Sequence, residues 1–435
     1  MLTGRPRTLA AATLATAMLS VGCSPATSRQ HSVAGPPAGT PSTSPGHVAT
    51  SAPPTRTSPR PTRPSAPLAP NPGGLSDTQM VGQLFISYVY GSTATTATAA
   101  QRAANIALYG VPTAAEVITR WHLGGVILID HNTLDPARPT LSTGNVSNAA
   151  QITVLTSGLQ AAAGADTNLP LLIGTDQEGG RVQRITTGVR QQPAQQQLAK
   201  LSPRALRCGY FSLGRQLRAL GINQDYAPVA DVVTTNTGVI GDRSFGPDPQ
   251  TDAADVTQAV AGLQQAGVLA TLKHWPGHGS TSTDSHAALA VIHENAARWR
   301  AVDRLPFQTA TPLAAAIMTG HLALPALDPS GLPATLSPTL VNGALRSGLG
   351  YSGLVLTDSL YMAPMQHAGT PAQVALRALA AGNDMLLETP DLPAAEQAVL
   401  TAVRTSPNSR AIVTGALTRI LHAKTQAEQP ANRRC

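Results

Sequence analysis

The chain has 435 residues, of which 42% are apolar, 12% charged and 3% aromatic, enough apolar material for a sizeable buried core. Its net charge of +7 does not indicate a nucleic-acid-binding protein. Six arginines and no acidic residue precede Asp77, which leaves 24 basic against 23 acidic residues in the rest of the chain. After residue 23 no uninterrupted apolar stretch of about twenty residues occurs, which argues against a polytopic membrane protein.

Residues 1–22 are expected to form a signal peptide. Arg5 and Arg7 precede a largely apolar run at residues 9–18, which is too short for a permanent membrane span. The segment ends in Leu-Ser-Val-Gly before Cys23, similar to a bacterial lipobox, although Ser20 stands where leucine is usual. We therefore expect export, lipidation of Cys23 and anchoring at the extracytoplasmic face of the cell membrane.

Residues 23–74 are expected to be a disordered linker rich in Pro, Ser and Thr. Ser24–Gly74 holds 13 of the 36 prolines and no aromatic residue, so it cannot bury enough surface to offset its chain entropy. At about 3.1 Å per residue in the polyproline II conformation, such a linker would extend at most on the order of 150 Å from its anchor.

The chain has three cysteines, a number that does not predict a disulfide framework. With Cys23 lipidated, Cys208 and Cys435 remain, and they pair only if the C-terminus returns to Cys208. We expect two unpaired thiols.

From Leu75 onward, short apolar runs alternate with helical segments. The runs expected to be strands are Gln83–Ser87, Gly124–Ile129, Leu169–Gly174, Gly221–Asp225, Leu269–Lys273, Ala315–Met318, Gly353–Thr357 and Asp384–Leu387. Several are apolar throughout, as in strands buried on both faces, and helical patterns such as Ala253–Ala266 and Pro371–Ala381 lie between them.

This alternation predicts an α/β fold, a single (β/α)₈ TIM-type barrel over residues 75–428, followed by a tail at residues 429–435. A doubly wound sheet is the alternative. After the eighth run only two helices are expected, Pro393–Arg404 and Ser409–Thr425, which leaves no room for a sizeable second domain.

Polar side chains follow the C-terminal ends of five expected strands. They are Asp176 and Glu178 after the third, Asp225 at the end of the fourth, Lys273 and His274 after the fifth, His321 after the sixth and Asp358 after the seventh. Each alone would be read as an ordinary loop charge. Because these strand ends share one rim of a barrel, their recurrence predicts a common site.

The densest polar segment is Lys273–Gly279, followed by Asp284-Ser-His286. His274 and His278 are four residues apart, but the Pro and Gly between them prevent the helix that a metal-binding His pair normally needs, so we expect no metal. The aspartate fixes the tautomer of the nearby imidazole and favours its protonated form, which suits a proton donor. No Gly-x-Ser-x-Gly elbow follows a strand, which argues against a serine hydrolase.

Eight motifs, in order, make the chain similar to a known family. They are Ile173–Arg184, Ala227–Asp231, Gly241–Gly246, Lys273–Gly279 with Asp284–His286, Met318–His321, Pro333–Ser337, Thr357–Leu360 and Ala381–Asp384. Together they resemble glycoside hydrolase family 3, and the Asp-x-His element points to its β-N-acetylglucosaminidase branch. The resemblance spans about residues 75–425.

The resemblance implies roles for nine residues and no cofactor. Asp358 matches the catalytic nucleophile, and His286, oriented by Asp284, matches the general acid/base. The positions that match those holding N-acetylglucosamine are Asp176, Arg184, Arg243, Lys273 and His274, with His278 in the same block. Two departures are Trp275, where the family often has Phe, and Ala287-Ala288 in place of a Pro-containing turn.

We therefore expect a retaining hydrolase that removes non-reducing terminal β-N-acetylglucosamine from peptidoglycan fragments and acts as a monomer. Phosphorolysis is a second hypothesis, because an imidazole is neutral after it donates its proton and would admit phosphate. A β-glucosidase of the same family is a third hypothesis, and a lipoprotein that only binds glycan is a fourth.

Overall fold

We describe the protein from a computed structural model that covers residues 72–233, 238–432 and 434–435. The expected signal peptide, Cys23 and most of the expected linker lie outside the described residues and stay predictions. The described chain begins with a 3₁₀-helical turn, Pro72–Gly74. Within the described ranges, no helix has both the length and the apolar character needed to cross a membrane.

Eight parallel strands form one nearly closed ring, in the spatial order β11, β9, β7, β6, β3, β2, β1, β12. The strands are β1 Phe85–Ser87, β2 Gly125–Ile127, β3 Leu172–Thr175, β6 Gln224–Asp225, β7 Leu269–Trp275, β9 Ala316–Thr319, β11 Leu354–Thr357 and β12 Leu386–Leu387. The ends of the sheet meet where the Thr357 N–H donates to the Met385 carbonyl (3.0 Å) and the Asp384 N–H to the Val355 carbonyl (2.7 Å). The predicted barrel is therefore confirmed, and the doubly wound alternative, with its open sheet edges, is excluded.

Each expected apolar run overlaps one strand of the ring, and the differences are at the boundaries. The run expected to begin at Gly221 pairs only at Gln224–Asp225, because Gly221 adopts a left-handed conformation (φ 79°) after a helix. Strand β7 continues two residues beyond Lys273, since Trp275 pairs with Thr319 of β9.

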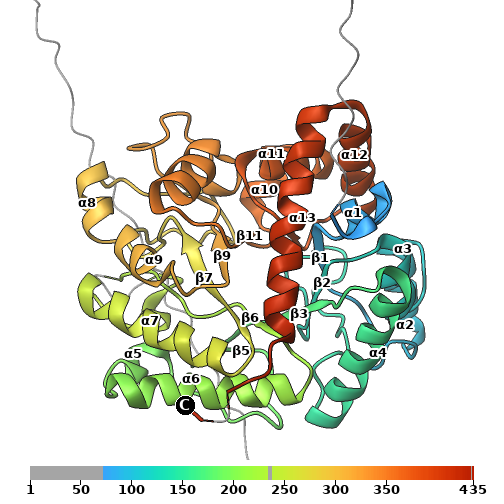
Figure 1. Cartoon of the computed structure of the whole chain (residues 1–435), viewed down its shortest axis with the longest axis horizontal. Helices are drawn as coiled ribbons and strands as arrows, with labels where there is room; N and C mark the ends of the chain where they lie inside the picture. Colours follow the sequence, from blue (N-terminus) through green and yellow to red (C-terminus); the bar gives the residue numbers. More distant parts are fainter. Residues whose placement is uncertain (1–71, 234–237, 433) are drawn as a thin grey trace, which may run out of the picture. The chain divides into compact units, whose positions relative to one another are not determined.

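Helices pack around the outside of the ring (Figure 1). They are α1 Asp77–Gly82, α2 Ala99–Tyr109, α3 Ala114–Trp121, α4 Ala149–Thr167, α5 Gln195–Leu198, α6 Pro203–Ala219, α7 Pro249–Gln265, α8 Ala296–Ala301, α9 Arg304–Ala310, α10 Ala363–Ala368, α11 Pro371–Ala381, α12 Leu392–Thr405 and α13 Pro407–Glu428. Shorter turns are Gly241–Arg243 and Ala334–Leu336, and Thr339–Ser347 is a π-helix.

Helix α11 illustrates how local sequence sets these boundaries. Thr370 and Gln373 form a reciprocal capping box at its N-terminus, and Pro371 occupies the first turn, where its missing N–H is tolerated. Gly382 ends the helix with a positive φ of 115°, a conformation that glycine adopts without steric cost. The sequence therefore specifies both ends of the helix, as expected.

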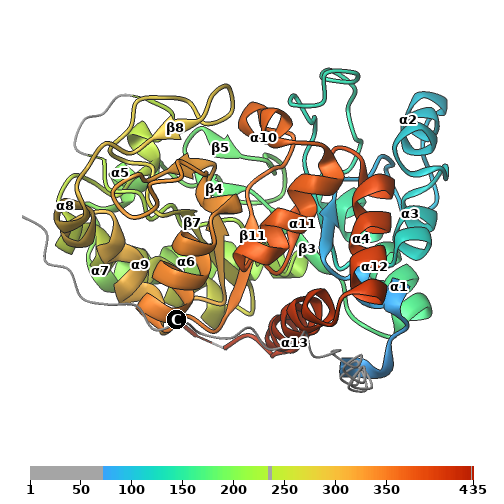
Figure 2. The same cartoon turned by 90° about the horizontal axis from the view of Figure 1, so that it is seen from above.

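The loops that follow the strands gather at one side of the ring. One loop carries the antiparallel pair β4 Gln177–Gly179 and β5 Val182–Gln183, and two others meet in the parallel pair β8 Ala290–Val291 and β10 Leu322–Ala323. In Figure 2, β4, β5, β8 and α10 lie on the side opposite α13. Sites of parallel barrels form at the C-terminal strand ends, so this side is where a site is expected.

Helix α13 covers the opposite, N-terminal ends of the strands. Lys424 donates to the Gln83 side chain before β1 (2.5 Å), and Arg419 donates to Asp384 before β12 (2.8 Å). Lys424 is buried, and burial lowers its pKa to about 7.

The chain after α13 returns to α6 and α7. The Asn432 N–H donates to the Gln265 carbonyl (2.7 Å) at the end of α7, and Cys435 forms a disulfide bond with Cys208 on α6. The expectation of two unpaired thiols is therefore wrong. The physical reason for the pairing is that α13 crosses the base of the ring, so that the tail after it lies beside α6 and α7. No local sequence signal marks this path.

Candidate active site

A cavity of about 260 Å³ opens at the C-terminal ends of the strands. The polar side chains that line it are Asp176, Glu178, Arg181, Arg184, Arg243, Lys273, His274, His286, Asp358, Ser359 and Glu388. Larger cavities of about 330, 370 and 470 Å³ lie elsewhere, but none of their linings has more than two charged side chains, against eight here. A dense set of charges around a small cavity is what catalysis on a polar molecule requires.

Seven of the nine predicted site residues line this cavity. They are Asp176, Arg184, Arg243, Lys273, His274, His286 and Asp358. Asp284 lies outside the lining and contacts His286. His278 is only 1% exposed and does not line the cavity, so its expected contact with the sugar is not supported by this placement.

Carboxylates and cations form one network along a wall of the cavity. The Lys273 ammonium lies 2.7 Å from both Asp176 and Glu178, and the Arg243 guanidinium donates to both oxygens of Glu178 at 2.7 and 2.8 Å. Burial alone would raise the pKa of Glu178, but Arg243 and Lys273 hold that pKa well below its usual range. Burial would also raise the pKa of Asp176, but Lys273 and Arg184 outweigh it and lower that pKa. The wall is thus ionised at neutral pH and holds its donors in fixed positions.

Asp358 follows β11 and is a carboxylate at neutral pH. Burial raises its pKa, but the imidazoles of His274, His321 and His286, together with the Ser359 N–H, lower it overall. That N–H donates to Asp358 Oδ1 at 2.7 Å. His321, expected at this rim, lies behind the lining, where its Nε2 contacts the Ser359 carbonyl at 2.9 Å and supports the segment. An ionised carboxylate at a cavity wall is competent to attack an electrophilic carbon.

His286 and Asp284 form a pair on an exposed loop. Asp284 Oδ1 lies 2.7 Å from His286 Nδ1 and also accepts the His286 N–H at 2.9 Å. The contact at Nδ1 leaves Nε2 as the nitrogen available for proton transfer. The His286 carbonyl accepts the N–H of Ala363 at 3.1 Å, so this loop is joined to the segment that follows Asp358.

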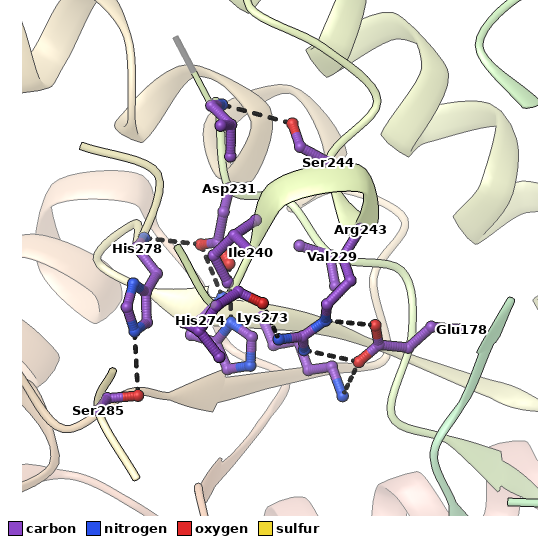
Figure 3. Close-up of polar contacts among 12 residues, drawn as sticks. Glu178, Val229, Asp231, Ile240, Arg243, Ser244, Lys273, His274, His278 and Ser285 are labelled. Carbon is purple, nitrogen blue, oxygen red and sulfur yellow. Dashed lines mark hydrogen bonds and ion pairs between the residues drawn. The ribbon is translucent and has the colours of Figure 1, made fainter. Parts of the chain in front are cut away.

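The segment Lys273–Gly279 is bent around the side chain of Asp231 (Figure 3). Asp231 Oδ1 accepts the N–H groups of His274 (3.0 Å) and His278 (2.8 Å), and Oδ2 lies 2.7 Å from His274 Nδ1. Gly277 has a positive φ of 120°, and a Cβ there would lie 2.6 Å from the Asp303 side chain. The bend predicted from Pro and Gly therefore directs His274 into the cavity and His278 away from it.

The two departures from the family pattern affect packing. The Trp275 ring is fully buried against Trp299 and Phe307, with centroid separations of 5.8 and 5.2 Å, and its N–H donates to the Leu340 carbonyl. In the loop after His286, the N–H groups of Ala287 and Ala288 both lie 3.1 Å from the Asp284 carbonyl. A turn thus forms there without proline.

Sequence reasoning missed Glu388, which lines the cavity after β12. Its φ is 52°, an uncommon conformation for a non-glycine residue, and burial raises its pKa to about 7. Its Oε1 has no hydrogen-bond partner among the described residues. The rule that identified the other strand-end residues would have found it had it been extended to the eighth strand.

The cavity lacks the arrangement of a metal centre. Across the described ranges, no group of three or more His, Cys, Asp or Glu side chains is placed to hold a metal ion. His274 Nδ1 is instead engaged by Asp231, and His278 Nε2 by Ser285.

Known proteins are similar to this chain in sequence. Residues 105–423 match the glycosyl hydrolase family 3 N terminal domain. Beta-hexosaminidase A of Pseudoalteromonas piscicida is 35% identical over 300 residues, which are 63% of this chain and 47% of that protein. Beta-hexosaminidase of Nitrosomonas eutropha is 33% identical over 284 residues, or 63% of this chain and 76% of that protein. The chain thus spans about half of one relative and three quarters of the other.

Solved structures of similar proteins also superimpose on this chain. A glycoside hydrolase family 3 beta-N-acetylglucosaminidase from Paenibacillus sp. str. FPU-7 superimposes with a TM-score of 0.71 and 34% identity, over 81% of this chain and 63% of that one. A beta-N-acetylhexosaminidase from Beutenbergia cavernae gives a TM-score of 0.69 and 30% identity, over 81% of this chain and 99% of that one. The family expected from the ordered motifs is confirmed, and the chain belongs to glycoside hydrolase family 3.

Proposed function

We propose that the protein is a retaining exo-β-N-acetylglucosaminidase that uses Asp358 as nucleophile and His286 as general acid/base. The observation that carries the proposal is that both side chains line one cavity, with Asp284 engaging the imidazole nitrogen opposite the reactive one. The relatives named β-hexosaminidase and β-N-acetylglucosaminidase support the same activity.

In the first step, the Asp358 carboxylate attacks the anomeric carbon, and the bond from that carbon to the leaving oxygen breaks. Protonated His286 gives its Nε2 proton to the departing oxygen, so the leaving group departs as a neutral alcohol and the imidazole becomes neutral. The product is a glycosyl ester on Asp358. The lowered pKa of Asp358 supports this role, because the attacking group must be ionised.

In the second step, a water molecule attacks the same carbon while His286 takes one of its protons. The ester bond breaks, Asp358 leaves as a carboxylate, and the sugar is released with its original β configuration. His286 is protonated again and ready for the next cycle. The charged wall of Asp176, Lys273 and Arg243 would bind the sugar hydroxyls during both steps.

We further propose that the substrate is non-reducing terminal β-N-acetylglucosamine on peptidoglycan fragments. This rests on the sequence features of a signal peptide, a lipobox-like Cys23 and a long linker, which would place the enzyme outside the membrane within reach of the cell wall. Chain release from the membrane on substitution of Cys23→Ser would test the anchor.

The activity is tested by digesting a defined muropeptide and identifying the released monosaccharide and its anomeric configuration by NMR. We expect β-N-acetylglucosamine and, for Asp358→Ala, a loss in kcat of up to about 10⁶-fold, the order seen when a covalent nucleophile is removed. Full activity of Asp358→Ala, or release of the α-anomer, would contradict the proposal.

The β-glucosidase and phosphorolysis hypotheses are tested with the same protein. Faster turnover of a glucoside than of the N-acetylglucosaminide would indicate a β-glucosidase. Formation of a sugar 1-phosphate in phosphate buffer would indicate phosphorolysis, which is chemically open here because neutral His286 adds no negative charge beside an incoming phosphate.

A further inference from the structure

The loop that carries the proposed acid/base residue contains one buried side chain. Between Gly279 and Leu289, Ser285 is the single buried residue, with 4% of its surface exposed. Its neighbours Asp284 and His286 have 53% and 47% of their side-chain surface exposed. An exposed pair flanking one buried serine takes its position from whatever holds that serine.

The group that holds Ser285 is His278. The His278 Nε2 lies 3.0 Å from Ser285 Oγ, and His278 itself is 1% exposed (Figure 3). The backbone of His278 is fixed in turn, because its N–H donates to Asp231 Oδ1 at 2.8 Å. Two hydrogen bonds, one to the backbone and one to the ring of His278, therefore connect the buried Asp231 carboxylate through His278 to Ser285, at the centre of the Asp284–His286 pair.

We propose that His278 is a positioning residue, which through Ser285 places His286 over the cavity for proton transfer. This assignment rests on the proposed function and deepens it, since it concerns the same site. It replaces the sugar-binding role expected from the sequence, because His278 does not line the cavity.

The direction of the hydrogen bond follows from the surroundings of the ring. His278 Nδ1 has no partner among the described residues, and a buried N–H without an acceptor costs more than an unused lone pair. The proton therefore belongs on Nε2, which donates to Ser285 Oγ. Burial lowers the pKa of His278, consistent with a neutral ring that holds this single tautomer.

A second contact explains why this tether has a catalytic consequence. The His286 carbonyl accepts the Ala363 N–H at 3.1 Å, which links the loop to the nucleophile's segment. Loss of the Ser285 tether would leave the pair attached at one point and free to pivot about it. A displacement of about 1 Å at a reacting group costs on the order of a hundredfold in rate.

The test compares two substrates that differ in their need for acid catalysis. Phenyl β-N-acetylglucosaminide has a poor leaving group, which needs protonation to depart. The leaving group of the 2,4-dinitrophenyl glycoside, 2,4-dinitrophenolate, departs without protonation. We expect Ser285→Ala and His278→Ala to lower kcat/KM for the phenyl substrate by about tenfold to a hundredfold, which is part of a general-acid contribution of about 10²–10⁴-fold, and for the dinitrophenyl substrate by less than about threefold. His278→Gln, which retains an N–H donor, should recover part of the loss.

The matched control is Ser280→Ala, an exposed serine of the same loop, which should leave both substrates within about twofold of wild type. Amide hydrogen exchange gives a readout that does not depend on turnover: residues 286–288 should exchange faster in Ser285→Ala and not in Ser280→Ala. Equal losses on both substrates, or unchanged exchange, would overturn the positioning role. If Asp358→Ala retained wild-type activity, the proposed function would fail instead.

Discussion

The buried Glu178 offers a quantitative test of the charged wall, through the substitution Glu178→Gln. Its carboxylate accepts two hydrogen bonds from Arg243 and contacts Lys273 at 2.7 Å, with 1% of its side chain exposed. Each charge-assisted hydrogen bond is worth about 1.5–3 kcal/mol. Gln retains one oxygen as acceptor but directs an NH₂ group at a cation, so we expect the net loss that follows removal of one partner of a buried ion pair, about 3–5 kcal/mol.

Urea unfolding at pH 7 measures the free energy of unfolding, with Arg181→Gln as a control, because Arg181 lines the same cavity but is half exposed. Substrate affinity should weaken in parallel, since Lys273 and Arg243 lose the carboxylate that orients them. A destabilisation below about 1 kcal/mol would refute the view that the buried pairs are mutually dependent.

Other substitutions test buried groups through their effect on the free energy of unfolding. Burial lowers the pKa of Lys424 to about 7 from 10.5, so between these values the unfolded chain binds a proton that the native protein lacks, and stability rises with pH. Lys424→Met should therefore exceed wild type in unfolding free energy below pH 7, by a margin that shrinks toward pH 10. Burial raises the pKa of Glu388 to about 7 from 4.5, so its effect on the pH dependence of stability has the opposite sign. Between these values the native protein binds a proton that the unfolded chain lacks, and the free energy of unfolding falls as pH rises. The fall in unfolding free energy between pH 5 and pH 8, measured by urea titration, should therefore be about 3 kcal/mol smaller in Glu388→Gln than in wild type. Cys208→Ser opens a cross-link across 227 residues, so a loss of up to about 5 kcal/mol is expected by calorimetry, and an unchanged melting temperature would contradict the disulfide.

The sequence predicted most of the barrel because several of its strands are apolar throughout and helical segments, many with their own capping residues, lie between them. Thr370, Pro371 and Gly382, for example, are local signals that mark both ends of α11. Strand-end polarity located the site for a similar reason: parallel strands carry their C-terminal residues to a common rim, so Asp176 and Asp358 meet there whatever the loops do.

Two placements could not be obtained this way. His274 and His278 are equally polar and four residues apart, and only the bend around Asp231 decides which of them enters the cavity. The pairing of Cys208 with Cys435 depends on the course of α13 across the base of the ring, which joins residues far apart in the chain. Both outcomes are set by long-range packing, which leaves no local signal.

Asp231 contacts both His274, which lines the cavity, and His278, which we propose positions the acid/base loop, and its two oxygens make different contacts with these residues. Oδ1 accepts the backbone N–H groups of His274 and His278, whereas Oδ2 lies 2.7 Å from Nδ1 of the His274 ring. Asp231→Asn preserves an acceptor for the two N–H groups but replaces the partner of His274 Nδ1 with a donor. It should therefore impair His274 while leaving the tether to Ser285 in place.

The expected result is a loss of about tenfold to a hundredfold in kcat/KM that is the same for phenyl and 2,4-dinitrophenyl substrates, in line with a lost buried charge-assisted hydrogen bond of about 1.5–3 kcal/mol. Asp231→Ala removes both contacts and should add the leaving-group dependence seen for Ser285→Ala. If Asp231→Asn instead affected the phenyl substrate selectively, the carboxylate would act on the acid/base loop through its charge. The inference that Oδ2 supports His274 while Oδ1 supports the tether to Ser285 would then be wrong.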